Sequence, residues 1–346
     1  MIIKIAKWIF LTVVSLSLLL AVVLFIGSKT SMDSDYSHTR QVGSLPEFSG
    51  QSMVSSGVEV VRISANGYEF RARIAGFESS VGTAKKPAVI LLHGFPVSSA
   101  MWIELISPLA KAGYRVVAFD QRGYSPGARP GELTDYTIDK LSSDVVAVAD
   151  ALGIETFHLI GHDWGSAVGW TTVMQYPQRI ESWTALSIAH PVAFSEALAN
   201  DPDQQSRSSY FMLFVTPWLP EALFSFNDFK MLGGVYSGML TEQKSEYIKL
   251  FSEPGALTAA LNWYRAMTLS QQGAAQQSPE ISIPTLFMWG SNDPTAGRLA
   301  VDMQKQYMTG PYEEVELEAG HWLITDQPVA VVGEVIKHLE THSHDQ

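Results

Sequence analysis

The feature that most limits how this chain can fold is the segment Leu159-Ile160-Gly161-His162-Asp163-Trp164-Gly165-Ser166. A mostly apolar run leads into Gly-x-Asp-x-Gly, and a segment with the composition of a helix follows. A strand that turns sharply into a helix needs small residues on both sides of the turn, and Gly161 and Gly165 supply them. Asp163 then projects in a strained conformation at the helix N-terminus, the geometry of a nucleophile elbow. An inert helix N-cap aspartate has the same local sequence, so the rest of the chain must distinguish the two.

Apolar runs and helical segments alternate along most of the chain, which predicts strands and helices joined by short loops. The predicted strands are residues 58–64, 68–75, 88–92, 115–119, 156–160, 183–188, 284–289 and 312–317, and the predicted helices are residues 98–112, 137–152, 164–176, 295–308 and 328–339. Asn66-Gly67 favours a tight hairpin turn between the first two strands. The alternation predicts an α/β fold with a mostly parallel sheet covered by helices on both faces.

The alternation of strands and helices is interrupted once, after the strand predicted at residues 183–188. From there to residue 282, buried-strand runs are absent and Trp, Tyr, Phe, Leu and Met recur at helical spacing. We therefore expect a helical cap inserted into the α/β core. The expected organisation is an N-terminal segment (1–27), a linker (28–54), the first part of the core (55–191), the cap (192–282) and the second part of the core (283–346).

The N-terminal segment has the composition of a membrane helix. Lys4 and Lys7 precede an uncharged apolar run from Trp8 to Gly27, which is long enough to cross a hydrocarbon core of ~30 Å. The residues after Gly27 fit a signal-peptide cleavage site poorly, so we expect an uncleaved single-pass anchor. The positive charge before the run predicts that the folded domain lies on the non-cytoplasmic side. The alternative is a cleaved signal peptide and a secreted or periplasmic protein.

Charge and cysteine content exclude several kinds of site. The 346-residue chain has a formal net charge of −12, which opposes binding to nucleic acid phosphates. It has no cysteine, which rules out disulfides, thiolate catalysis and cysteine-ligated metals.

A carboxylate nucleophile needs partners, and two residues at later strand ends can supply them. Attack by Asp163 on carbon gives an ester, and its hydrolysis needs a general base, normally a histidine oriented by a carboxylate. Asp293 follows the predicted strand 284–289, and His321 follows the strand 312–317. In a parallel sheet these strand ends meet at one edge. A turn aspartate and a packed loop histidine are the alternatives, but the order nucleophile, acid, histidine is that of the α/β-hydrolases.

The same fold predicts two backbone donors for the oxyanion of the ester's tetrahedral intermediate. One is the N–H group of Trp164, directly after the nucleophile. The other is the N–H group of Phe95, in the loop His93-Gly94-Phe95-Pro96 that follows the strand 88–92.

Together these motifs resemble those of the epoxide hydrolase group of the α/β-hydrolase fold. The residues that carry the resemblance are His93-Gly94-Phe95-Pro96, Asp120-Gln121-Arg122-Gly123-Tyr124-Ser125, Gly161-His162-Asp163-Trp164-Gly165, the Asp293 loop and Gly320-His321-Trp322. The resemblance covers residues 55–340. It implies an enzyme that converts an apolar epoxide and water to a vicinal diol, with no cofactor and no metal, and the N-terminal segment adds the expectation of a membrane anchor. It also implies that His93, Gly94 and Pro96 shape the oxyanion loop and substrate pocket.

Epoxide hydrolases also place two cap tyrosines near the epoxide oxygen, where an acid or hydrogen-bond donor is needed as the ring opens. Tyr264 lies in Asn-Trp-Tyr-Arg, a close match to the family's motif. Tyr210 matches by its spacing to Pro217 and Glu221. The resemblance therefore implies that Tyr210 and Tyr264 bind the epoxide oxygen. Aromatic packing within the cap is the alternative for both residues.

Two other kinds of function remain open on the same fold, a dehalogenase and a receptor-like protein. A haloalkane dehalogenase would use indole N–H groups to bind halide, and Trp164 could be one donor, although Phe95 stands where a polar residue is usual. A fluoroacetate dehalogenase would need an arginine in place of Trp164. A receptor-like protein that only binds an apolar ligand would be expected to have a broken triad.

Overall fold

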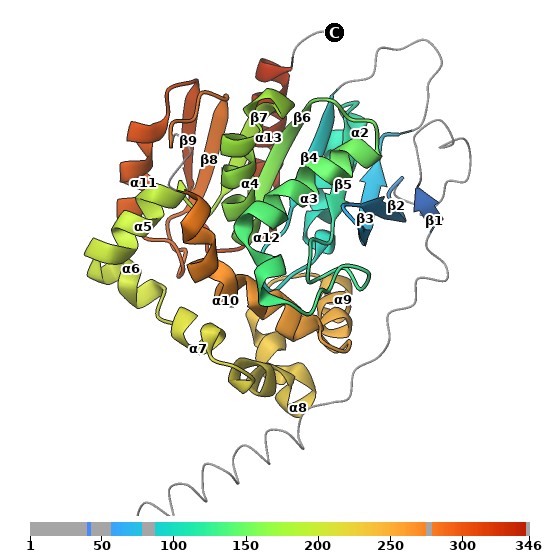
Figure 1. Cartoon of the computed structure of the whole chain (residues 1–346). Coiled ribbons are helices and arrows are strands. Elements are labelled where there is room, and N and C mark those ends of the chain that lie inside the picture. Colours follow the sequence, from blue (N-terminus) through green and yellow to red (C-terminus); the bar gives the residue numbers. More distant parts are fainter. Residues whose placement is uncertain (1–39, 43–56, 78–86, 275–278, 344–346) are drawn as a thin grey trace, which may run out of the picture.

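The computed structural model describes residues 40–42, 57–77, 87–274 and 279–343. In this part of the chain, nine strands form one sheet in the order β1-β2-β3-β5-β4-β6-β7-β8-β9 (Figure 1). The strands are β1 (Arg40–Val42), β2 (Glu59–Ala65), β3 (Tyr68–Ala75), β4 (Ala88–Leu92), β5 (Arg115–Phe119), β6 (Phe157–His162), β7 (Ile180–Leu186), β8 (Thr285–Gly290) and β9 (Tyr312–Leu317). Strand β3 is antiparallel to both β2 and β5, whereas the other neighbouring pairs are parallel. The structure thus confirms the predicted α/β fold with a mostly parallel sheet.

Helices cover both faces of the sheet. The core helices are α2 (Ile103–Lys111), α3 (Ile138–Ala151), α4 (Trp164–Gln175), α11 (Arg298–Gln304), α12 (Leu323–Asp326) and α13 (Pro328–His342). Helices α3 and α4 contact each other on one face, and α2 and α13 contact each other on the other (Figure 1). Every residue of β4, β6 and β8 is buried, as the continuous apolar runs predict for strands covered on both sides.

The predicted and observed elements differ mainly where a segment is short. The predicted helix 98–112 begins as a 3₁₀ turn, Ser99–Trp102, and becomes α-helical only at Ile103. The strand predicted at residues 183–188 begins earlier, at Ile180, and is β7. Strand β1, which pairs with β2, and the four-residue helix α12 are not evident in the sequence pattern, because such short elements show no periodicity.

A helical cap lies between β7 and β8 in the chain, and it covers one end of the sheet (Figure 1). Its helices are α5 (Pro191–Asn200), α6 (Pro202–Arg207), α7 (Phe211–Val215), α8 (Leu219–Val235), α9 (Thr241–Phe251) and α10 (Ala256–Ala274). Helix α8 is interrupted at residues 226–229, where the backbone leaves the helical conformation. The inserted cap is confirmed, while the predicted domain boundaries at residues 55, 192 and 283 stay predictions.

The predicted membrane anchor and membrane location are corrected by the structure. Among the described residues, no helix combines the length and apolar character that a bilayer-spanning helix needs. The longest of them, α10, has 19 residues and carries Arg265 in its middle. The segment 1–27, on which the anchor was predicted, and almost all of the linker 28–54 lie outside the described residues.

Candidate active site

The turn between β6 and α4 holds Asp163 in the left-handed region of backbone space, with φ of 55°. A non-glycine residue adopts this conformation only when its surroundings impose it. The glycines make the turn possible by close approach. A Cβ atom on Gly161 would collide with the carbonyl of Gly165, one on Gly165 would collide with the carbonyl of Leu92, and one on Gly94 would collide with the Asp163 side chain. The backbone thus has the nucleophile-elbow geometry that the sequence predicts.

Each carboxylate oxygen of Asp163 faces a different group. The Phe95 N–H group donates to Oδ1 over 2.8 Å, and the backbone N–H group of Trp164 lies close enough to the carboxylate to lower its pKa. Atom Oδ2 lies 3.7 Å from Nε2 of His321, which is too long for a hydrogen bond. One oxygen is therefore held by the Phe95 donor, while the other faces the imidazole.

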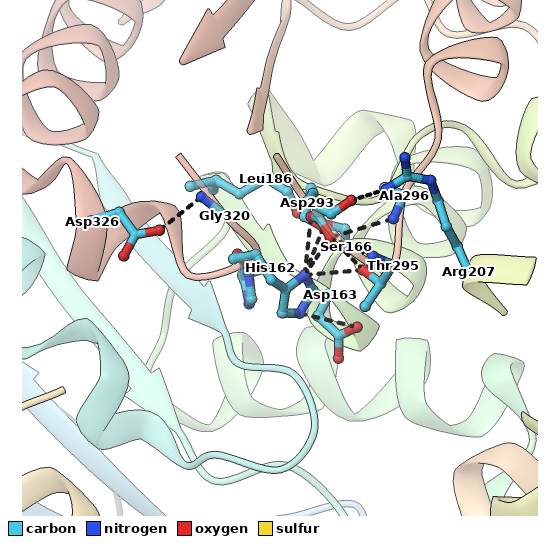
Figure 2. Close-up of polar contacts among 12 residues, drawn as sticks. His162, Asp163, Ser166, Leu186, Arg207, Asp293, Thr295, Ala296, Gly320 and Asp326 are labelled. Carbon is cyan, nitrogen blue, oxygen red and sulfur yellow. Dashed lines mark hydrogen bonds and ion pairs between the residues drawn. The ribbon is translucent and has the colours of Figure 1, made fainter. Parts of the chain in front are cut away.

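Asp293 follows β8 and His321 follows β9, and the two side chains are in contact at the carboxyl edge of the sheet. Figure 2 shows Asp163, Asp293 and Thr295 close together at this edge. Nδ1 of His321 lies 3.0 Å from Oδ2 and 3.3 Å from Oδ1 of Asp293. The Asp293 carboxylate also accepts hydrogen bonds from the Ser187 hydroxyl (2.6 Å) and from the backbone N–H and hydroxyl of Thr295 (2.7 and 2.8 Å). This carboxylate has enough partners to hold the imidazole with Nε2 directed at Asp163.

Burial and charge set the protonation of these three side chains. Burial alone would lower the pKa of His321, but the charge and hydrogen bond of Asp293 and the charge of Asp163 raise it to about 8. Burial alone would raise the pKa of Asp293, but the charge of His321 and the hydrogen bonds it receives hold that pKa well below its usual range. Burial raises the pKa of Asp163, and the charge of His321 and the two backbone N–H groups oppose the rise.

His162, beside the nucleophile, contacts the backbone of the histidine loop. Its Nε2 lies 2.7 Å from the carbonyl oxygen of His321, so Nε2 carries the hydrogen and donates it. Burial, followed by the charge of His321, lowers the pKa of His162 to about 3, which keeps the ring neutral. His162 therefore holds the backbone of the loop that carries His321.

The loop 93–96 carries the Phe95 donor over the carboxylate. His93 is fully buried, and its Nε2 accepts the N–H group of Gln121 over 3.0 Å. Burial lowers the pKa of His93 to about 4, so the ring stays neutral and can accept. Phe95 and Pro96 line a cavity at the site, whereas His93 and Gly94 lie beneath it. Of the three residues expected to shape the pocket, only Pro96 lines the cavity directly.

Tyr210 and Tyr264 approach the same cavity from the cap. Tyr264 lies on α10, and Tyr210 directly precedes α7. Their ring centroids are 6.3 Å apart in an edge contact. The Trp164 ring in turn lies edge-on to the Tyr264 ring at a centroid distance of 5.0 Å. Burial, with a contribution from the charge of Asp163, raises the pKa of both phenols well above 10, so both remain proton donors.

Two cavities meet at Asp163 and Tyr210. The first has a volume of about 300 Å³ and is bounded by His321, Trp322 and the aromatic cap. The second, of about 320 Å³, runs past Trp164 toward α4 and α5 and is lined mainly by apolar side chains. A ligand in either cavity can reach the carboxylate of Asp163.

Three residues that contact Asp293 are not indicated by the sequence pattern. Ser187 follows β7 with a positive φ of 73° and directs its hydroxyl at Asp293. Thr295 could have been found, because an aspartate commonly binds the backbone two residues later in a turn. Arg207, on α6 of the cap, donates from Nη1 to the backbone carbonyl of Asp293 (Figure 2). No local pattern signals Ser187 or Arg207, because each contact joins residues more than 80 positions apart.

Comparison with known proteins agrees with this geometry. Residues 87–328 match the family model of the alpha/beta hydrolase fold. The chain is 34% identical to epoxide hydrolase 4 of Homo sapiens over 280 residues, which cover 78% of this chain and 75% of that protein. It is 33% identical to the AB hydrolase superfamily protein YfhM of Bacillus subtilis (strain 168), over 82% of this chain and 99% of that protein.

A solved structure agrees in fold as well. The crystal structure of epoxide hydrolase A from Mycobacterium thermoresistibile superposes with a TM-score of 0.69 at 28% identity, covering 84% of this chain and 100% of that one. These similarities extend over both the core and the cap. The residues that match the family model, 87–328, include the elbow, the acid loop and the histidine loop. The chain therefore belongs to the epoxide hydrolase family of the α/β-hydrolase fold.

Proposed function

We propose that this protein hydrolyses an apolar epoxide to a vicinal diol through a covalent ester on Asp163. The observation that carries the proposal is the two-sided environment of the Asp163 carboxylate. The Phe95 N–H group binds Oδ1, the His321 imidazole lies 3.7 Å from Oδ2, and Tyr210 and Tyr264 line the same cavity. A nucleophile, a base and donors for a leaving oxygen thus surround one space.

In the first step, Oδ2 of Asp163 attacks the less hindered epoxide carbon. A C–O bond forms to the enzyme while the ring C–O bond breaks, and its electron pair moves to the epoxide oxygen. Tyr210 and Tyr264 hydrogen-bond this oxygen as it gains negative charge. Their hydroxyls remain protonated because burial raises the pKa of both, so they are available as donors throughout the step.

In the second step, His321 takes a proton from water, and the resulting hydroxide attacks the ester carbonyl of Asp163. Negative charge develops on Oδ1, to which the Phe95 N–H group already donates, and the Trp164 N–H group lies close to the same carboxylate. Collapse of the tetrahedral intermediate breaks the bond between Cγ and Oδ2, so Oδ2 leaves with the product and the carboxylate is restored from Oδ1 and the oxygen of water. The two protons of that water, one held by His321 and one on the attacking oxygen, pass to Oδ2 and to the epoxide oxygen, which gives the neutral diol.

The order of the steps changes the strength of the base. In the free protein, the negative charge of Asp163 contributes to the raised pKa of His321. Ester formation replaces this charge with a neutral group. The pKa of His321 therefore falls after the first step, and the ring becomes neutral when it is needed to accept a proton from water.

The preference for an apolar substrate is supported by the side chains around both cavities. The first is enclosed by Phe95, Phe214, Phe224 and Trp322, and the second by Met174, Ile188, Phe194 and Met267, among others. Since both cavities reach Asp163, an epoxide with apolar substituents on both ring carbons can place one on each side of the nucleophile.

A haloalkane dehalogenase is not favoured. The human relative and the solved structure named above are epoxide hydrolases, and the Trp164 ring packs edge-on against Trp263 and Tyr264. A receptor-like protein without catalysis would not need an Asp293 carboxylate held by Ser187 and Thr295 and in contact with His321.

The test is a single turnover in ¹⁸O-water with an aryl-substituted epoxide and, in parallel, a chloroalkane of similar size. We expect diol from the epoxide, no halide release, and ¹⁸O in the Asp163 carboxylate instead of the first diol formed. Label in the first diol would rule out the covalent route, and halide release without diol would favour the dehalogenase.

A further inference from the structure

The residue that supplies the oxyanion donor belongs to a core loop, but its surroundings come mostly from the cap. The Phe95 ring makes edge or tilted contacts with Phe214, Phe224, Phe251 and Tyr264, at centroid distances of 5.3, 6.3, 6.1 and 5.4 Å. All four partners lie on cap helices. The position of this residue therefore depends on where the cap sits.

Three cap side chains also bind the polar groups of the loop that follows. The Tyr236 hydroxyl donates to the carbonyl oxygen of Pro96 over 2.7 Å, and Gln243 donates to the carbonyl oxygen of Ala100 over 3.0 Å. The Ser98 hydroxyl donates to Glu246 over 2.9 Å. We call Tyr236, Gln243 and Glu246 the cap clamp.

Tyr236 makes the contact nearest to the reacting atoms. It is the C-cap residue of α8 and is fully buried. Its hydroxyl donates to Pro96, the residue directly after Phe95. Burial raises the pKa of Tyr236 well above 10, so its hydroxyl always has a proton to donate. The Tyr236 hydroxyl itself lines neither cavity and touches no reacting atom.

We propose that Tyr236 is a positioning residue for the oxyanion hole, holding the Phe95 N–H group in line with Oδ1 of Asp163 through its hydrogen bond to Pro96. The inference rests on the proposed function, because it assigns the residue to one of the two chemical steps. A Phe95 donor that drifts by a fraction of an ångström binds the developing oxyanion less well.

The effect falls on the second step. During ester hydrolysis, charge accumulates on Oδ1, so a misaligned Phe95 donor slows the reaction. During alkylation, the carboxylate loses charge, so a weaker hydrogen bond to Oδ1 does not slow attack. A residue that serves only to stabilise the fold would not distinguish the two steps.

The test compares Tyr236→Phe with Tyr247→Phe, a matched control. Tyr247 is also fully buried, and its ring lies 5.1 Å from that of Tyr236. Within the described part of the chain, its hydroxyl has no hydrogen-bond partner. Both variants lose one buried hydroxyl in the same cluster, and only Tyr236→Phe loses a contact with the oxyanion loop.

Rapid-quench intact-mass measurements on the full chain give the alkylation rate and the ester hydrolysis rate separately. For Tyr236→Phe we expect hydrolysis to slow by about 10-fold, part of the ~10²–10³-fold effect of losing a whole oxyanion donor, while alkylation is unchanged. The ester should therefore accumulate to a higher level than in the wild-type protein. Tyr247→Phe should match the wild type in both steps.

Equal hydrolysis rates in the two variants would overturn the inference, as would equal slowing of both steps by Tyr236→Phe. If Tyr236→Phe does not fold, Tyr236→Met removes the same hydrogen bond to Pro96 with a flexible apolar side chain, and an unchanged ratio of the two rates there would also overturn it. Absence of ester in the wild-type protein would overturn the proposed function as well. Ester in the wild type with identical variants would overturn only the role of Tyr236.

Discussion

The core side and the cap side of the cavity hold their functional groups by different forces. On the core side, Asp163, Asp293 and His321 are fixed by hydrogen bonds and charge. The Asp293 carboxylate, for example, accepts hydrogen bonds from Ser187, Thr295 and the His321 imidazole. On the cap side, the tyrosines are fixed mainly by aromatic edges. The Tyr264 ring contacts five aromatic rings at centroid distances of 5.0–6.3 Å.

This difference has a chemical meaning. Charged groups that must exchange a proton lie where polar partners set their pKa, whereas the neutral donors lie among apolar rings that keep them protonated. We therefore expect Asp293 and His321 to govern hydrolysis of the ester, and the cap tyrosines to assist its formation on Asp163. Variants on the two sides should separate the two steps.

The largest effect is expected from His321→Gln, which removes the base and keeps the nucleophile. Turnover should fall by about 10³-fold or more, as for loss of a catalytic histidine, while the ester still forms and accumulates. Intact mass after mixing with epoxide should show the protein plus one substrate. The double variant Asp163→Ala/His321→Gln is the control and should show no added mass. A His321→Gln protein without adduct would remove this histidine from the second step.

A smaller effect, on the other step, is expected from Tyr210→Phe and Tyr264→Phe. Each removes one donor to the epoxide oxygen, so alkylation should slow by about 10–10²-fold and hydrolysis of the preformed ester should be unchanged. Rapid-quench rates for the two steps measure this, with Tyr247→Phe as the matched loss of a buried hydroxyl. Slower ester hydrolysis in either variant would mean that the two sides do not divide the steps as proposed.

The smallest effect is a pH dependence of stability on the core side. The pKa of His321 is raised from about 6.5 in the unfolded chain to about 8 in the folded one. Its bound proton therefore stabilises the fold fully below about pH 6.5, and this contribution, about 2 kcal/mol, is lost as the pH rises through about 8. Urea unfolding of the wild type and His321→Gln at about pH 6 and pH 9 measures it. A wild-type advantage that does not shrink at the higher pH would contradict the raised pKa.

The same comparison explains how much of the molecule the sequence predicts. Asp163 and Asp293 follow the buried strands β6 and β8, and His321 follows the partly exposed edge strand β9. The carboxyl ends of parallel strands must meet at one edge, so short local patterns suffice to bring the three residues together. Their distances and hydrogen bonds could not be predicted. The ring contact between Tyr210 and Tyr264 depends on how two cap segments pack.

The contacts between the cap and the core are the least predictable. Tyr236 and Pro96 are 140 positions apart, and no sequence motif links the two residues. Helix α8 also changes direction at residues 226–229, which helical spacing alone cannot indicate. Where a side chain meets a distant carbonyl, the sequence pattern records only that both residues are buried.

The aromatic contacts around Phe95 have a consequence for engineering. Exchange of the cap is an obvious route to a new substrate range, because the cap lines much of both cavities. However, the same segment surrounds the Phe95 ring and binds the backbone at Pro96 and Ala100. A transplanted cap must therefore bring equivalents of the clamp residues, or the host will form its ester and release product slowly. Exchange of the cap should therefore change substrate selectivity and turnover together.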